Sequence, residues 1–207
     1  MMNSFPICIG EKKQKSYAFI VNVLLVIVIA VLCFNIYFNA RFTRVYVVGN
    51  SMLNTLVGAK DENVSGGDYV YVDRNAVPHR GDIVVIGTER KIIIKRIIAF
   101  GGDSVRISDG VVYLNGAPLD EPYVSDSNNR LKEDYPRGGG EITVPQGHVF
   151  FLGDNRDVSV DSRSDTYGTL SEDQILGVVT DWSVKLKGFF TGINTFFEFT
   201  VPSFFGG

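Results

Sequence analysis

The chain has 207 residues, of which 45% are hydrophobic and 21% are charged, and its formal net charge at pH 7 is −3. This length allows one sizeable globular domain together with a membrane element. The near-neutral charge, without a basic stripe interleaved with aromatic residues, argues against a nucleic-acid partner. The only two cysteines, Cys8 and Cys33, lie near the N-terminus, so the rest of the chain can form neither disulfides nor cysteine-ligated metal sites. We expect no cofactor.

The first predicted element is a membrane-spanning helix at residues 16–40, a stretch of 25 residues without a charged side chain. About 20 apolar residues are enough to span a bilayer. The alternative is a cleaved signal peptide, but its apolar region would be about 7 to 15 residues long and would end in a small-x-small site. The cytoplasmic N-terminus is predicted to comprise residues 1–15, because positive charges precede the helix at Lys12, Lys13 and Lys15. The following chain is then outside the cell.

A mainly β domain is predicted for residues 41–187, where short runs rich in β-branched and aromatic residues alternate with Gly and Asp turns. Within it, residues 125–140 are polar and Gly-rich, which indicates a surface excursion or a flexible loop. The tail at residues 188–207 carries seven phenylalanines and could either pad the domain or lie on the membrane surface. The runs predicted to be strands are residues 45–48, 68–72, 82–86, 91–98, 104–107, 111–114, 141–144, 148–152 and 175–179.

One of these strands, in the run KIIIKRIIAF, contains Lys95 among isoleucines. The period of two places Ile93, Lys95 and Ile97 on one face. An amine that is buried among apolar side chains loses hydration of its charged form, which lowers its pKa, and a neutral amine can act as a general base. The alternative is that Lys95 extends its charge past the isoleucines into water, as lysines commonly do.

A serine nucleophile is the partner that such a lysine requires, and Ser51 is the candidate. It follows Gly49, which permits a tight turn after the run VYVV. A neutral lysine can replace histidine as the base that activates a serine hydroxyl. The two histidines, His79 and His148, are expected to be exposed or capping residues, since neither has a local arrangement that indicates a catalytic triad.

A third stretch, residues 151–163, is dense in turn-forming residues and in charges of both signs. It could be a solvated loop in which Asp161 and Arg163 pair at the surface, where such pairs contribute about 0 to 1 kcal/mol. The alternative is a polar scaffold that orients the base.

Together these stretches resemble the type I signal peptidases of bacteria, and the resemblance covers nearly the whole chain. It is carried by the apolar N-terminal segment and by four motifs in order. These are Ser-Met-x-x-Thr-Leu at residues 51–56, Gly-Asp-Ile-Val-Val at 81–85, Lys-Arg at 95–96 followed by Gly-Gly-Asp at 101–103, and Gly-Asp-Asn-Arg-Asp-x-Ser-x-Asp-Ser-Arg at 153–163. The single apolar helix, the small domain and the glycine at position 49 are similar to the Gram-positive branch.

The resemblance implies a membrane-anchored serine endopeptidase that removes signal peptides from exported preproteins with a Ser-Lys dyad. Ser51 matches the nucleophile and Lys95 the general base. The resemblance also implies supporting roles for the residues around the dyad: Gly49, Met52, Ser159, which positions the lysine, and Asp161 and Arg163, which form an ion pair beneath the site. Asp154, Asn155 and Arg156 match residues of the scaffold.

The chain departs from the family pattern at two positions. Asn54 stands where proline is usual, and the loss of the fixed proline φ is expected to loosen the nucleophile loop. Gly49 stands where some members carry a serine that helps to bind the oxyanion, so the oxyanion hole is expected to consist chiefly of backbone N–H groups, including that of Ser51.

Two other functions are consistent with parts of this pattern. Self-cleaving Ser-Lys repressor peptidases resemble the catalytic core, but the apolar segment and the lack of a helix-turn-helix argue against them. A non-cleaving membrane-anchored β module that binds exported or pilin-like proteins is the second alternative, which Asn54 favours. An enzyme requires the Ser51 hydroxyl and the Lys95 amine to lie within or just beyond hydrogen-bond reach, with Ser159 adjacent.

Overall fold

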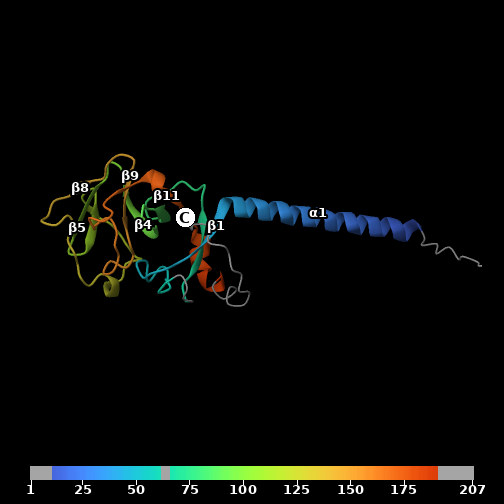
Figure 1. The fold of residues 1–207 in the computed structure, drawn as a ribbon, viewed down its shortest axis with the longest axis horizontal. Coiled ribbons are helices and arrows are strands. Elements are labelled where there is room, and N and C mark those ends of the chain that lie inside the picture. Colours follow the sequence, from blue (N-terminus) through green and yellow to red (C-terminus); the bar gives the residue numbers. More distant parts are fainter. Residues whose placement is uncertain (1–10, 62–65, 191–207) are drawn as a thin grey trace, which may run out of the picture. The chain divides into compact units, whose positions relative to one another are not determined.

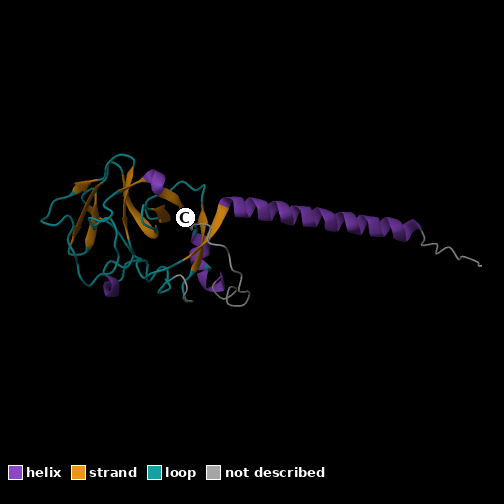
Figure 2. Ribbon diagram, in the orientation of Figure 1, coloured by secondary structure: helices purple, strands orange, loops and turns teal. Residues whose placement is uncertain are grey.

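The computed structural model describes residues 11–61 and 66–190. The chain divides between Arg41 and Phe42 into two compact units. The first unit is dominated by helix α1, Glu11–Arg41, and the second is a β-rich domain with two sheets (Figures 1 and 2). An apolar N-terminal helix followed by a mainly β domain was the predicted fold class, and it is confirmed. Residues 191–207 of the phenylalanine-rich tail lie outside the described residues.

Helix α1 forms because residues 16–40 are apolar and contain no proline or glycine to interrupt it. Its segment Tyr17–Arg41 is long and apolar enough to cross a membrane. Two asparagines within it, Asn35 and Asn39, donate their side-chain amides to the carbonyls of Val31 and Asn35, each at 2.9 Å. The polar groups near this end of the helix are therefore satisfied within the helix itself.

The first sheet has seven strands in the order β1-β2-β11-β3-β4-β9-β10. All neighbours in it are antiparallel. Its strands are β1 Phe42–Tyr46, β2 Tyr69–Asp73, β3 Ile83–Gly87, β4 Ile92–Phe100, β9 His148–Leu152, β10 Leu170–Ser171 and β11 Ile175–Val179.

The second sheet has four antiparallel strands in the order β7-β6-β5-β8. In Figure 1, β5 and β8 lie at the end of the domain opposite to β1. The strands are β5 Ser104–Ser108, β6 Val111–Leu114, β7 Ala117–Pro118 and β8 Ile142–Thr143. The described part of this domain also has three short helices: η1 Asp126–Asn128, η2 Glu172–Gln174 and α2 Asp181–Lys185.

Three apolar clusters form the core, and each follows from the alternation of side chains along the strands. One cluster joins the two sheets, with Phe150 and Leu152 of β9 against Val105 and Val112 of the second sheet. The other two clusters cover opposite faces of the first sheet. On one face lie Val84, Ile86, Ile93, Ile97, Val149, Phe151 and Val178, and on the other lie Val47, Met52, Leu56, Val70, Val72, Ile83, Val85 and Val179.

Strand β4 has a feature that positions the candidate site. It pairs with β3 from Ile92 to Arg96, but with β9 only from Arg96 to Phe100. The chain after β9 departs at Gly153, so the segment of β4 before Arg96 has an open edge on that side. Residues from other parts of the chain can approach this edge.

Candidate active site

Ser51 lies in a turn of residues 50–56, which we call the nucleophile turn. Gly49 enters it with φ of 81°, a conformation that glycine adopts without strain, and its N–H donates to the Ala59 carbonyl at 2.8 Å. Met52 and Leu56, at 1% and 0% exposed, anchor the turn in the core. The turn closes where the Leu56 N–H donates to the Met52 carbonyl at 2.8 Å. Met52 therefore supports the nucleophile turn through packing.

Lys95 lies on β4 and is only 4% exposed. Its Nζ donates to Ser51 Oγ at 2.7 Å and to the Ile94 carbonyl at 3.1 Å, where β4 has no partner strand on the β9 side. Burial lowers the pKa of Lys95 to about 8, although the nearby Asp161 carboxylate acts in the opposite direction. The alternative of a lysine that extends into water is therefore wrong, and the amine titrates about one pH unit above neutral pH.

The geometry required of a dyad is present, since the two predicted groups are in hydrogen-bond contact across 44 sequence positions. The histidines contact other residues. His79 has a side chain that is 76% exposed and lies 3.5 Å from Asp82, and His148 Nδ1 lies 3.1 Å from the Gln146 carbonyl. Lysine is thus the basic group that the structure brings to Ser51.

Ser159 was expected beside the lysine. Its hydroxyl is buried against Gly153, but it makes no hydrogen bond within the described residues, so it is not bonded to Lys95. A Cβ at position 153 would overlap both Ser159 Oγ and the Ser51 carbonyl, which shows how closely these backbones approach. The role of Ser159 in positioning Lys95 stays a prediction.

Asp161 and Arg163 form a bidentate ion pair. Arg163 Nε and Nη2 lie 2.9 and 3.1 Å from the two carboxylate oxygens, and the carboxylate also accepts the Gly153 N–H at 3.0 Å. Asp161 is fully buried and the Arg163 side chain is 11% exposed. The interpretation of a solvated surface pair is therefore wrong, and the pair shapes residues 153–163, which we call the polar loop.

The other charged residues of the polar loop also make structural contacts. Asp154 pairs with Arg96, at 2.6 Å between Nη2 and Oδ2, and accepts the Thr55 hydroxyl. Asn155 holds the nucleophile turn directly, since its N–H donates to the Ser51 carbonyl and its Nδ2 to the Asn50 carbonyl, both at 3.0 Å. Asn155 thus holds the backbone on both sides of Ser51.

Arg156 donates to Glu121 at 2.6 and 3.1 Å, and the ring of Tyr123 lies 3.8 Å from the Arg96 guanidinium. Sequence reasoning missed Glu121 and Tyr123, as well as Arg96 as the partner of Asp154. Their contacts join residues 27 to 58 positions apart, so no local pattern indicates them.

The loosening expected at Asn54 stays a prediction, but its backbone conformation is one that proline does not share. Its φ is 87°, which proline with its φ near −65° cannot adopt, so this turn differs from one that carries proline. Its side-chain Nδ2 donates to Ser125 Oγ at 2.7 Å. A hydrogen bond to another segment thus holds the Asn54 side chain, and the turn would have to rearrange to accept proline at this position.

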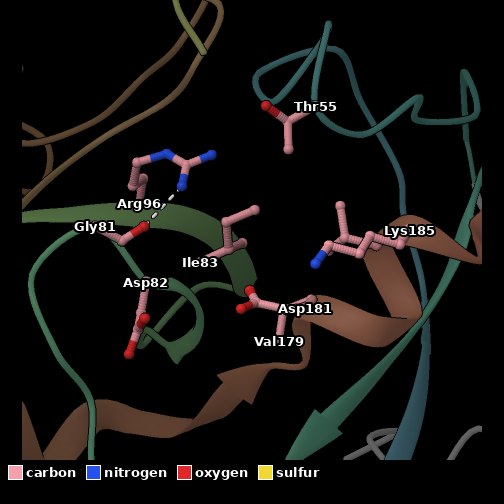
Figure 3. A pocket seen from close by; sticks show the side chains of 9 residues that line it. Thr55, Gly81, Asp82, Ile83, Arg96, Val179, Asp181 and Lys185 are labelled. Carbon is pink, nitrogen blue, oxygen red and sulfur yellow. Dashed lines mark hydrogen bonds between the residues drawn. The ribbon is translucent and has the colours of Figure 1, made fainter. Parts of the chain in front are cut away.

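A small cavity of about 160 Å³ adjoins the nucleophile turn, and its lining residues do not include Ser51 or Lys95. Figure 3 shows it between Thr55, Arg96 and, from α2, Asp181 and Lys185. The Arg96 guanidinium there is already bonded to the Gly81 carbonyl at 2.7 Å. In the described part of the chain, no three His, Cys, Asp or Glu side chains are grouped so that they could hold a metal ion.

Comparison with known proteins finds relatives over most of the chain. The family described as signal peptidase, peptidase S26, matches residues 20–182. Signal peptidase I U of Bacillus subtilis is 36% identical over 177 residues, which cover 81% of this chain and 87% of that protein. Signal peptidase IB of Staphylococcus aureus is 30% identical over 158 residues, which cover 67% of this chain and 82% of that protein.

A crystal structure of a signal peptidase I from Enterococcus faecalis is 30% identical and aligns with a TM-score of 0.42, covering 51% of this chain and 98% of that chain. The family match extends from the apolar helix to α2 and includes Ser51, Lys95 and the polar loop. The chain belongs to the peptidase S26 family of signal peptidases.

Proposed function

We propose that Ser51 and Lys95 are the nucleophile and the general base of a type I signal peptidase that cleaves signal peptides from exported preproteins. The observation that carries this proposal is the 2.7 Å contact between Lys95 Nζ and Ser51 Oγ. It is supported by the lowered pKa of the buried lysine, about 8, which leaves roughly a tenth of the amines neutral at pH 7. A neutral amine has a lone pair that can accept the hydroxyl proton.

In the first half of the reaction, the neutral Lys95 amine takes the Ser51 proton as Oγ attacks the scissile carbonyl carbon. The tetrahedral intermediate collapses when the lysine ammonium gives that proton to the leaving amine, which breaks the C–N bond and leaves an ester on Ser51. Water then attacks the ester, with Lys95 again accepting a proton and returning it to Ser51 Oγ. The products are the signal peptide acid and the free amine of the mature protein.

The oxyanion is proposed to bind the backbone N–H of Ser51. This N–H donates no hydrogen bond within the part of the chain that the structure describes. Gly49, with φ of 81°, turns the chain just before it and offers no side chain at the position where some relatives carry serine. Backbone donors held by a fixed turn are effective because they need no reorganisation as charge develops.

The scissile segment is proposed to bind in an extended form along the open edge of β4, from Ile92 to Ile94. This edge is free of β9 and leads to Lys95. Pairing with a strand edge supplies main-chain hydrogen bonds that do not depend on the substrate's side chains. The preference for small side chains at the first and third positions before the cut is carried over from the family resemblance.

The apolar segment of α1 is proposed to anchor the enzyme in the cell membrane, with residues 1–15 in the cytoplasm and the catalytic domain, residues 41–187, outside the cell. The support is the length of the segment Tyr17–Arg41 and the three lysines that precede it. The apolar segment is then in contact with membrane lipid.

The test is cleavage of a purified preprotein by the full-length chain in detergent, with Ser51→Ala, Lys95→Ala and the exposed Lys60→Ala as a matched lysine control. The native chain and Lys60→Ala should cut after a small-x-small site. Both dyad variants should be slower by several powers of ten, since members of a dyad act as a unit. Equal inactivity of all four folded proteins on several preproteins would instead favour a non-cleaving binding module.

A further inference from the structure

Residues 121–131, which we call the η1 segment, lie against the nucleophile turn. Sequence reasoning assigned most of this segment to a surface or flexible loop. Within it, Asn128 is the only buried polar residue, at 7% exposed. Its side-chain Nδ2 donates to the Leu53 carbonyl at 3.1 Å, two residues after Ser51. Its own carbonyl accepts the Asp157 N–H at 3.1 Å. One residue therefore joins the nucleophile turn to the polar loop.

A second contact connects the nucleophile turn to the η1 segment. Asn54 Nδ2 donates to Ser125 Oγ at 2.7 Å, and this oxygen lies 2.8 Å from Ser127 Oγ. Ser127 Oγ in turn lies 3.5 Å from Asn128 Oδ1. The side chains of the η1 segment thus form a connected network facing the nucleophile turn, with Asn128 at its buried end.

The η1 segment is itself fixed to the charged core of the site at both ends. At its start, Glu121 pairs with Arg156, and their side chains are 9% and 3% exposed. At its end, the Leu131 N–H donates to the Asp157 carboxylate at 3.0 Å. Because these partners belong to the polar loop, the segment can hold the nucleophile turn at a set position rather than move with it.

We propose that Asn128 is a positioning residue for Ser51, an inference that rests on the proposed role of Ser51 as nucleophile. The Ser51 and Lys95 side chains come from different elements, so their contact depends on where the nucleophile turn lies relative to β4. Asn128 holds that turn by the Leu53 carbonyl, and Asn155 holds it by the Ser51 carbonyl. A misplacement of about 1 Å in such a site can cost about 100-fold in rate.

The test compares Asn128→Ala with Asn129→Ala in the full-length chain, using preprotein cleavage to measure kcat and KM. Asn129 is the matched neighbour, since its Nδ2 donates to the Gly110 carbonyl in the turn between β5 and β6. Asn128→Ala should lower kcat by about 10- to 100-fold with KM changed less than about twofold. Asn129→Ala should keep both values close to native. Rates are normalised to the folded fraction from thermal unfolding.

A second variant, Asn128→Asp, guards against a folding defect because it preserves the side-chain volume. It replaces the donating amide with a carboxylate oxygen opposite the Leu53 carbonyl, so the same loss of kcat is expected. Folded Asn128 variants with a native kcat, or with a raised KM alone, would overturn the proposal. The reference is the activity of the native chain, which Ser51→Ala should abolish. If Ser51→Ala abolishes cleavage but the Asn128 variants do not slow it, the role of Asn128 is wrong and the proposed function stands.

Discussion

At the scale of single residues, Lys95 shows how burial serves chemistry at a cost in stability. The lowering of its pKa from 10.5 to about 8 corresponds to a cost of about 3 kcal/mol at pH 7, because folding must neutralise or desolvate the amine. Between about pH 8 and pH 10.5, the unfolded chain binds more protons at Lys95 than the folded chain does. The contribution of Lys95 to the free energy of unfolding therefore rises with pH across that range.

The first prediction concerns the pH dependence of cleavage. Only the neutral amine is a base, so kcat/KM should rise about tenfold between pH 7 and pH 9, with a midpoint near the Lys95 pKa of about 8. Burial is the main cause of the lowered pKa, and the charge of Lys91 lowers it further. The variant Lys91→Ala should therefore move the midpoint to higher pH. A flat native profile from pH 6 to 9, or a midpoint that moves to lower pH in this variant, contradicts the assignment.

The second prediction concerns Asn54, whose φ is 87°. Asn54→Pro should lower the free energy of unfolding by more than about 1 kcal/mol and slow cleavage, because the proline ring excludes this φ and the turn must rearrange. Asn54→Gly accepts the backbone conformation and loses only the bond to Ser125, so it should remain closer to native in both measurements. Chemical denaturation and preprotein cleavage give the comparison. If Asn54→Pro is as active as the native chain, the turn does not require the φ of 87° at this position.

At the scale of elements, the strands were predictable because their signal is local. Each of the nine predicted runs overlaps an observed strand, and the alternation within KIIIKRIIAF correctly separated the Lys95 face from the Arg96 face. The two-residue strands β7 and β10 and the five-residue helix α2 were missed. Such elements are too short for a periodic pattern and depend on their neighbours.

The contacts between elements were not predictable in the same way. Ser51 and Lys95 could be paired because a serine nucleophile requires a base. The sequence around Asn128 and Glu121 does not indicate which residues these two side chains contact. Their roles arise only when residues 121–131 meet the nucleophile turn and the polar loop. Polar side chains in residues 125–140 indicated a flexible loop, but some of them form specific hydrogen bonds. Asn128, for example, is only 7% exposed and donates to the Leu53 carbonyl.

At the scale of the whole molecule, the two units differ in what stabilises them. Helix α1 satisfies its backbone internally and presents apolar side chains along Tyr17–Arg41, as a bilayer requires. The β domain buries its apolar residues in three clusters, and around the candidate site lie the ion pairs Arg96–Asp154, Arg156–Glu121 and Arg163–Asp161. A peptidase of this family therefore combines a segment suited to lipid with a domain suited to water.

The last prediction tests the orientation with thiol chemistry, since the chain has only Cys8 and Cys33. If residues 1–15 are cytoplasmic, a membrane-impermeant maleimide should leave the native chain unlabelled in intact cells and should label Cys8 after permeabilisation. The variant Val77→Cys places a thiol on the β domain where the native side chain is 72% exposed, so it should be labelled before permeabilisation. Cys33 lies in the apolar segment and should react slowly throughout if this segment spans the membrane, because little reactive thiolate forms in lipid. Labelling of Cys8 in intact cells, with protection of the thiol that Val77→Cys introduces, would establish the opposite orientation.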